Sequence, residues 1–133
     1  MAARHSTSGF ITMLSVLIAS ALGTVVAVSL LELGIGATKA AAAFGYSRQA
    51  RSLGSACGEV ALQKIADSQG YTGSDTIPLG AGSCTYTVSS DGGQNDTITA
   101  SGTVGTTVRK IKITIDQIQP KIHVTSWQEV ADY

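Results

Sequence analysis

An uncharged and mostly apolar stretch runs from Phe10 to Leu31 and reads FITMLSVLIASALGTVVAVSLL. As an α-helix this stretch would rise by about 33 Å, which is close to the roughly 30 Å hydrocarbon core of a bilayer. The apolar region of an ordinary secretory signal is shorter, about 7–15 residues, and a cleavage site of small residues follows it. The stretch therefore predicts one membrane-spanning helix, over residues 10–38, that is retained in the mature protein.

The residues in front of this stretch indicate how the helix is oriented. Arg4, His5 and the amino terminus supply the positive charge of the short segment MAARHSTSG. Positively charged flanks stay on the cytoplasmic side of a membrane. We therefore expect a single-pass protein of the cell membrane, with a cytoplasmic amino terminus and with everything beyond Glu32 outside.

Length and charge limit what the rest of the chain does. The chain has 133 residues, and its nine basic and nine acidic residues give a formal net charge of zero. Outside the apolar stretch there is room for one small domain. Two large domains are excluded, as is a barrel of alternating strands and helices, which needs about 250 residues. The balanced charge argues against nucleic acid as a partner held by bulk electrostatics.

Residues 39–69 show the periodicity of an amphipathic helix that continues the membrane helix. Their alanine-rich composition favours helix, and Gly70 is placed to cap its carboxyl end. One face of this helix carries apolar residues at helical spacing, so it needs a partner surface. The expected face consists of Tyr46, Ala50, Leu53, Cys57, Val60 and Ala61.

The carboxy-terminal half predicts a small antiparallel sheet. We expect a loop over residues 70–83, where Pro78, Gly80 and Gly82 interrupt any regular element. Residues 84–133 then hold four strands in up-and-down order, at 85–88, 97–101, 108–115 and 122–130. The strand at 108–115 alternates isoleucine with polar residues, which is typical of a sheet with one buried face. The expected fold class is α+β, a long transmembrane and amphipathic helix packed on a four-stranded sheet.

The two cysteines, Cys57 and Cys84, both fall in the region expected outside the membrane, where disulfides persist. A bridge between them would join the helix to the first expected strand. The alternative is a pair of buried free thiols. The only histidines are His5 and His123, and no paired cysteine spacing occurs. Neither a zinc site nor any other metal or cofactor is therefore expected.

No arrangement of residues predicts catalysis. Ser-His-Asp chemistry has no candidate set of residues, and no glycine-rich phosphate loop follows a strand, so the chain is not expected to be an enzyme. Asp91, Asn95 and Asp96 partly match a calcium loop but lack its ligand spacing, which favours a polar hairpin turn. The basic residues near the last strands are expected to form a solvated sheet face and not a nucleic-acid site: Arg109, Lys110, Lys112 and Lys121.

Ser8 and Gly9 stand directly before Phe10 and the apolar helix. A short positive segment that ends in glycine in front of the helix resembles the class III signal of type IV pilins and pseudopilins. In that family a membrane peptidase cuts after the glycine, and the new amino-terminal residue is methylated. The resemblance implies a cytoplasmic leader over residues 1–9, cleavage between Gly9 and Phe10, and methylation of Phe10. The alternative is an uncleaved signal anchor.

The order of elements, from membrane helix through amphipathic extension and loop to sheet, resembles the pilins over the whole chain. The resemblance implies a filament subunit, located in the cell membrane and then at the cell surface or in a pilus. Its implied partners are other pilin subunits, the prepilin peptidase, the membrane and the inner-membrane assembly platform. Leu14 stands where that family usually has glutamate, which favours a minor pilin, and Glu32 lies too far along the helix to replace it. The alternatives are a pseudopilin of a type II secretion or DNA-uptake system, and a stand-alone membrane-anchored adhesin or binding module.

Overall fold

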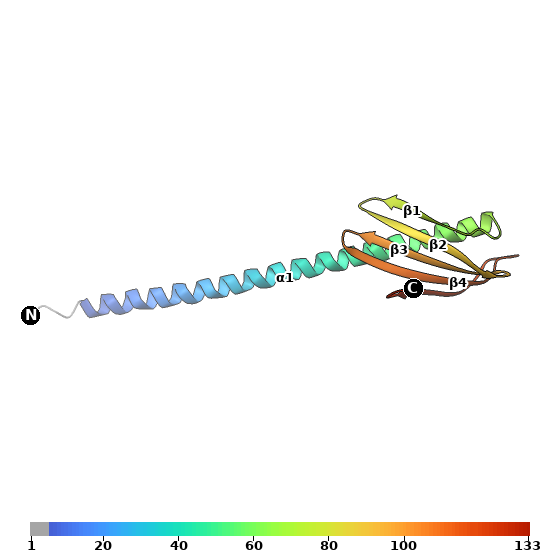
Figure 1. Cartoon of the computed structure of the whole chain (residues 1–133). Coiled ribbons are helices and arrows are strands. Elements are labelled where there is room, and N and C mark those ends of the chain that lie inside the picture. Colours follow the sequence, from blue (N-terminus) through green and yellow to red (C-terminus); the bar gives the residue numbers. More distant parts are fainter. Residues whose placement is uncertain (1–5) are drawn as a thin grey trace, which may run out of the picture. The chain divides into compact units, whose positions relative to one another are not determined.

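The structure is a computed structural model that describes residues 6–133 (Figure 1). The first five residues of the expected leader, with Arg4 and His5, lie outside the described residues. Helix α1 (Ser6–Asp67) comes first, and five strands follow it. The chain divides into two compact units, and the boundary between them follows Ala42. The strands are β1 (Gly73–Leu79), β2 (Gly82–Gly92), β3 (Asn95–Val104), β4 (Thr107–Gln117) and β5 (His123–Val130).

Helix α1 is one continuous helix of 62 residues. It passes without a break through Gly23, Gly34 and Gly36, because both prolines of the chain lie beyond its end. At its carboxyl end the amide of Ser68 donates to the carbonyl of Lys64 at 3.0 Å. Gly70 follows with a φ of 75°, a left-handed conformation that glycine adopts at little cost. The expected stop at Gly70 is therefore confirmed.

The sheet has five strands and not the four that the sequence predicts. Its order is β1-β2-β3-β4-β5, with every neighbouring pair antiparallel, so the expected up-and-down order is confirmed. The additional strand is β1, which lies inside the segment expected to be a loop. It pairs only with β2, with Ile77 opposite Cys84. Edge strands tolerate proline because one side of their backbone needs no partner, and Pro78 lies in β1 for that reason.

One face of the sheet packs against the part of α1 that belongs to the second unit. Ile111, Ile113 and Ile115 are buried in this face, as their alternation predicts. The helix contributes small residues to the contact. A Cβ atom on Gly54 would lie 3.3 Å from the amide nitrogen of Gly102 in β3, so the two backbones approach closely. The buried residues of the helix are Ala50, Gly54, Cys57, Gly58, Ala61 and Ile65.

The apolar face predicted for this helix is partly wrong. Ala50, Cys57 and Ala61 are buried as expected, but Tyr46 is 53% exposed and Val60 is 36% exposed. The helix-to-sheet contact is made where side chains are small enough to let the backbones meet. The contact face is therefore rotated away from the larger residues that periodicity alone favours.

Candidate functional site

The expected processing site lies near the start of α1. Gly9 and Phe10 are both helical and exposed, and a Cβ on Gly9 would meet no atom within 4 Å apart from its chain neighbours and the nearby backbone of its own helix. The carbonyl oxygen of Gly9 accepts a hydrogen bond from the hydroxyl of Thr12 at 2.9 Å. The bond between Gly9 and Phe10 is thus close to a helix end, where the first amide groups have no partners within the helix. Cleavage there and methylation of Phe10 stay predictions.

The segment that follows exposes apolar side chains all round the helix. Phe10 is 69% exposed, Leu14 is 48% exposed and Leu33 is 71% exposed. A helix that is apolar on every side is typical of a membrane span or of the centre of a large core. Within the described residues one helix, starting near the amino terminus, is long and apolar enough to cross a membrane. Leu14 adds one more apolar side chain to this surface and supplies no carboxylate.

The hydroxyl groups of this segment are hydrogen-bonded within the helix itself. Ser15 donates to the carbonyl of Ile11 at 2.8 Å, and Ser29 donates to that of Val25 at 2.9 Å. Hydroxyl side chains commonly bond to a carbonyl in the preceding turn. Each of these hydroxyl groups therefore has an acceptor within its own helix. Six residues behave in this way: Thr12, Ser15, Ser20, Thr24, Ser29 and Thr38.

Two charged residues interrupt the uncharged surface of the helix between Gly9 and Ser47. They are Glu32 and Lys39, and no other acidic or basic residue occurs in that range. Each lines its own shallow groove on the helix surface. Neither takes part in any ion pair among the described residues. The charges stand apart on an otherwise apolar surface.

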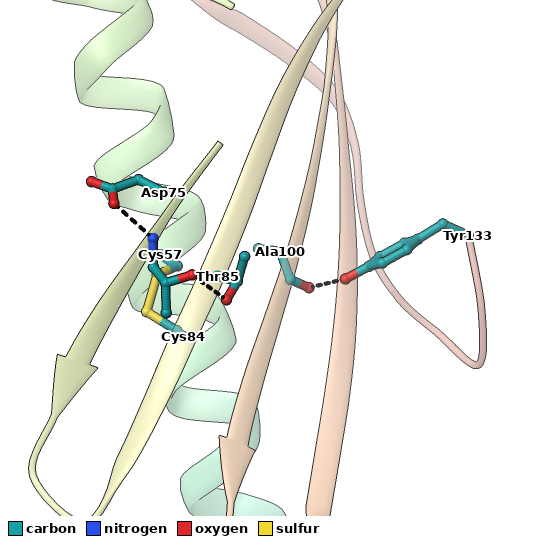
Figure 2. The surroundings of a disulfide bond; sticks show 7 residues. Cys57, Asp75, Cys84, Thr85, Ala100 and Tyr133 are labelled. Carbon is teal, nitrogen blue, oxygen red and sulfur yellow. Dashed lines mark hydrogen bonds between the residues drawn. A yellow bond between two sulfur atoms is a disulfide. The ribbon is translucent and has the colours of Figure 1, made fainter. Parts of the chain in front are cut away.

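Cys57 and Cys84 are joined in a disulfide that links α1 to β2 (Figure 2). Their Cα atoms are 5.9 Å apart, and 27 residues separate them in sequence. Both side chains are buried in the core of the second unit. The pairing expected from the sequence is thus present between the helix and the second strand of the sheet.

Tyr86 belongs to the same buried core cluster as the disulfide. Its hydroxyl is 3.4 Å from the hydroxyl of Tyr71, and its side chain is 1% exposed. The hydrogen bond with Tyr71, followed by burial, raises the pKa of Tyr86 to about 12. The hydrogen bond between the two tyrosines connects the loop after α1 to β2.

Asp96 is a buried carboxyl group that sequence reasoning assigned to a polar turn. It is 1% exposed, and its Oδ2 atom has no hydrogen-bond partner. Asp91 instead accepts a hydrogen bond from Thr97, so the two aspartates face different surroundings. Counting in steps of two from buried Ile98 places Asp96 on the inner face of β3. That alternation is the signal that could have identified it.

Of the four basic residues expected on a solvated sheet face, Lys110 and Lys112 share one face of β4, opposite buried Ile111 and Ile113. Arg109 reaches the helix, where its Nε donates to the hydroxyl of Ser47 at 2.9 Å and its Nη1 lies 3.1 Å from Glu129. Lys110 pairs instead with Asp132. Lys112 is exposed two residues further along β4, and Lys121 lies in the bend before β5. Acidic partners thus balance the charges of Arg109 and Lys110.

The last residues of the chain lie against the sheet. The hydroxyl of Tyr133 donates to the carbonyl of Ala100 at 2.8 Å, as Figure 2 shows. The ammonium group of Lys110 lies 4.9 Å from the centre of the Tyr133 ring. The hydrogen bond that Lys110 donates to the Asp132 carboxylate raises the pKa of Lys110. An open pocket beside these residues is lined by Val108–Lys110 and Glu129–Ala131, and its charged groups are already paired.

The described residues contain no group of three or more His, Cys, Asp or Glu side chains placed to hold a metal ion. His123 lies at the start of β5, with its Nδ1 atom 2.6 Å from Asp116. Comparison with family models, curated proteins and solved structures finds no match to this chain. The likeness to pilins therefore rests on the long amino-terminal apolar helix, packed further along on an antiparallel sheet.

Proposed function

We propose that the chain is a structural subunit of a type IV pilus or a related filament, of the minor-pilin kind. The observation that carries the proposal is the continuity of α1. One helix presents an all-round apolar surface from Phe10 onward and then, with no break, becomes the helix that the sheet covers. Such a helix serves as a membrane anchor and later as the core of a filament, while the sheet domain faces outward.

The processing signal supports the same proposal. Gly9 precedes Phe10 directly, and both are exposed near the helix end. A prepilin peptidase would cut between them on the cytoplasmic side, and Phe10 would become the methylated amino terminus. The assembly platform would then transfer the helix from lipid to the neighbouring helices of other subunits. Helix packing is the driving force, since lipid tails and apolar side chains are similarly apolar.

Mass spectrometry of the protein purified from membranes tests the proposal. We expect a mature chain that begins at methylated Phe10, and we expect a Gly9→Val variant to keep its leader. Ser8→Ala is the matched control, because it leaves the residue before the cut unchanged. An intact Met1 or Ala2 terminus in the natural chain would contradict the proposal and favour a membrane-anchored binding module.

A second measurement distinguishes a pilus subunit from a pseudopilin. Filaments sheared from the cell surface should contain the chain if it is a pilus subunit. A processed chain that is absent from sheared filaments and stays in the membrane favours a secretion or DNA-uptake pseudopilin.

A further inference from the structure

Asn95 is the only asparagine in the sequence, and it opens the triplet Asn95-Asp96-Thr97. An asparagine followed two residues later by serine or threonine, with a residue other than proline between them, is the acceptor pattern for N-linked glycosylation. The pattern is used on surface segments of exported chains. Everything beyond Glu32 is expected outside the membrane, so the triplet lies in the part of the chain where such a sugar chain would be attached.

The structure places Asn95 at an open turn. It is the exposed first residue of β3 and follows the turn between β2 and β3. Gly92 and Gly93 in that turn have φ values of 103° and 67°, which glycine adopts at little cost. A Cβ on either glycine would meet no atom within 4 Å apart from its chain neighbours. The space beside the Asn95 side chain is therefore large enough for a sugar.

The one hydrogen bond of the Asn95 side chain is compatible with a glycan. Its Nδ2 atom donates to the carbonyl of Gly92 at 3.2 Å. A side-chain amide nitrogen carries two hydrogens, and glycosylation replaces only one of them. The remaining hydrogen can keep the bond to Gly92, so the modified side chain fits the folded hairpin.

The other two residues of the triplet are engaged once the sheet has formed. Asp96 is 1% exposed, and the hydroxyl of Thr97 donates to Asp91. The backbone of Thr97 lies between two strands, opposite Ser89 in β2 and Thr114 in β4. The hydroxyl residue is part of the acceptor pattern, so an enzyme that reads the pattern has to reach it. The triplet is accessible as a whole only before β3 pairs with its neighbours.

We propose that Asn95 carries an N-linked glycan, which is transferred from a lipid-linked oligosaccharide before β2 and β3 pair. The inference goes beyond the proposed function, because it holds equally for a filament subunit and for a membrane-anchored binding module. It needs only that the second unit lies outside the membrane.

The transfer is a substitution at the first sugar of the donor. The Nδ2 atom of Asn95 forms a bond to the anomeric carbon, and the bond from that carbon to the phosphate oxygen of the lipid carrier breaks. The lipid phosphate leaves with the electron pair, and Nδ2 gives one proton to a base of the transferase. Nothing is oxidised or reduced, so the lipid-linked sugar is the only co-reactant.

A glycan at this position also limits how copies of the chain contact one another. Gln94 joins the turn to the connection between β4 and β5, since its Oε1 accepts from the amides of Ile118 and Gln119, each at 3.0 Å. The two connections therefore form one end of the sheet. A sugar chain on the neighbouring Asn95 keeps that end in water and unavailable for packing against a second copy.

Mass spectrometry of the full chain purified from its natural cells tests the inference. Trypsin releases residues 65–109 as one peptide, because no lysine or arginine lies between Lys64 and Arg109. After reduction of the disulfide, we expect this peptide to carry a sugar mass that an N-glycan amidase removes, leaving aspartate at position 95. An unmodified Asn95 in the natural protein would overturn the proposal.

Variants made in the same cells test the acceptor pattern. Asn95→Gln and Thr97→Ala should lose the glycan completely, whereas Thr97→Ser should keep it because serine also satisfies the pattern. Thr99→Ala is the matched control, since Thr99 lies on the same face of β3 two residues beyond the triplet. Retention of the glycan in Thr97→Ala, or its loss in Thr99→Ala, would contradict a site at Asn95. The Cys57–Cys84 disulfide reports in each variant that the second unit has folded.

The order of transfer and folding is tested at the turn. Gly93→Ala puts a side chain at a φ of 67° and so slows closure of the hairpin. We expect the glycosylated fraction to be at least as high as in the natural chain, and a lower fraction would overturn transfer before pairing.

The outcomes are independent of those for the proposed function. A chain that begins at methylated Phe10 with an unmodified Asn95 would overturn this inference and leave the filament proposal standing. A glycosylated chain with an intact Met1 or Ala2 terminus would do the reverse.

Discussion

Gly102 of β3 lies directly against the carbonyl oxygen of Ala50 in α1. A Cβ atom on Gly102 would collide with that oxygen and would come within 2.6 Å of the amide nitrogen of Gly54. The obstacles are backbone atoms, which cannot rotate aside as a side chain does. Helix and sheet in the second unit are therefore in contact through their main chains at this point.

Gly102→Ala should consequently destabilise the second unit. Forcing a methyl group into a filled space costs about 1–3 kcal/mol, and we expect the upper end of that range in the free energy of unfolding. Chemical denaturation of the full chain in detergent, followed by circular dichroism, measures it. Gly45→Ala is the control, because its Cβ would meet no atom within 4 Å apart from its chain neighbours and the nearby backbone of its own helix. Alanine there should raise the free energy of unfolding by at most about 1 kcal/mol. Equal stability of the two variants would refute the close approach.

Replacing both cysteines by alanine should lower the free energy of unfolding by about 3–4 kcal/mol, the loop-closure value for a bridge spanning 27 residues. The cause is the larger freedom of the unfolded chain once helix and β2 are no longer joined. Thermal unfolding with and without reductant measures the loss. The reduced natural protein should approach the double variant, whereas two reactive thiols in the unreduced protein would disprove the bridge.

Alkaline pH should destabilise the core around Tyr86. The hydrogen bond with Tyr71 and burial raise the pKa of Tyr86 from 10.0 to about 12, so the folded state favours the neutral phenol. This contribution to stability is complete below pH 10 and is lost as the pH rises toward 12. Stability curves across that range, together with tyrosinate absorbance, follow the change. Tyr86→Phe should flatten the curve, and exposed Tyr46→Phe should leave it unaltered.

Asp96→Asn should stabilise the second unit. The buried Oδ2 atom has no partner, and an uncompensated polar group in a core costs about 1–3 kcal/mol, more when it is charged. The neutral amide keeps the shape and removes the charge, so we expect a gain on the order of 1 kcal/mol. Equilibrium denaturation near neutral pH measures it. Asp91→Asn, at an exposed position, is the matched control, and a loss of stability in Asp96→Asn would show that the carboxylate has a stabilising partner.

The sequence identifies the parts of this fold that follow from local periodicity. The apolar helix, its stop at Gly70 and the alternation of Ile111, Ile113 and Ile115 are all read from neighbouring residues. The missed strand, β1, contains Pro78 and is flanked by glycines. It exists because β2 offers a pairing edge, and that is a tertiary condition that local propensity does not contain.

The contact face of the helix was harder to predict for a related reason. Apolar periodicity favours Tyr46 and Val60, but both are exposed. The sheet contacts the helix at Gly54 and Gly58, where the lack of a side chain lets the two elements approach closely. A search for apolar periodicity does not select glycine, because glycine is barely hydrophobic. Asp96 was assigned to a turn because aspartate is polar. Its position two residues before Ile98 places its side chain on the buried face of β3. The roles proposed for the processing and assembly residues involve other molecules. The structure of a single chain does not test those roles, and they stay predictions.

The internally bonded hydroxyls of α1 have a consequence for the energetics of moving the helix between environments. Ser15, Ser29 and their counterparts keep the same acceptors whether acyl chains or protein side chains surround them. Exchange of one surrounding for the other neither breaks nor forms a hydrogen bond at these positions. At its hydroxyl positions the segment is therefore equally satisfied in surroundings of lipid and of protein.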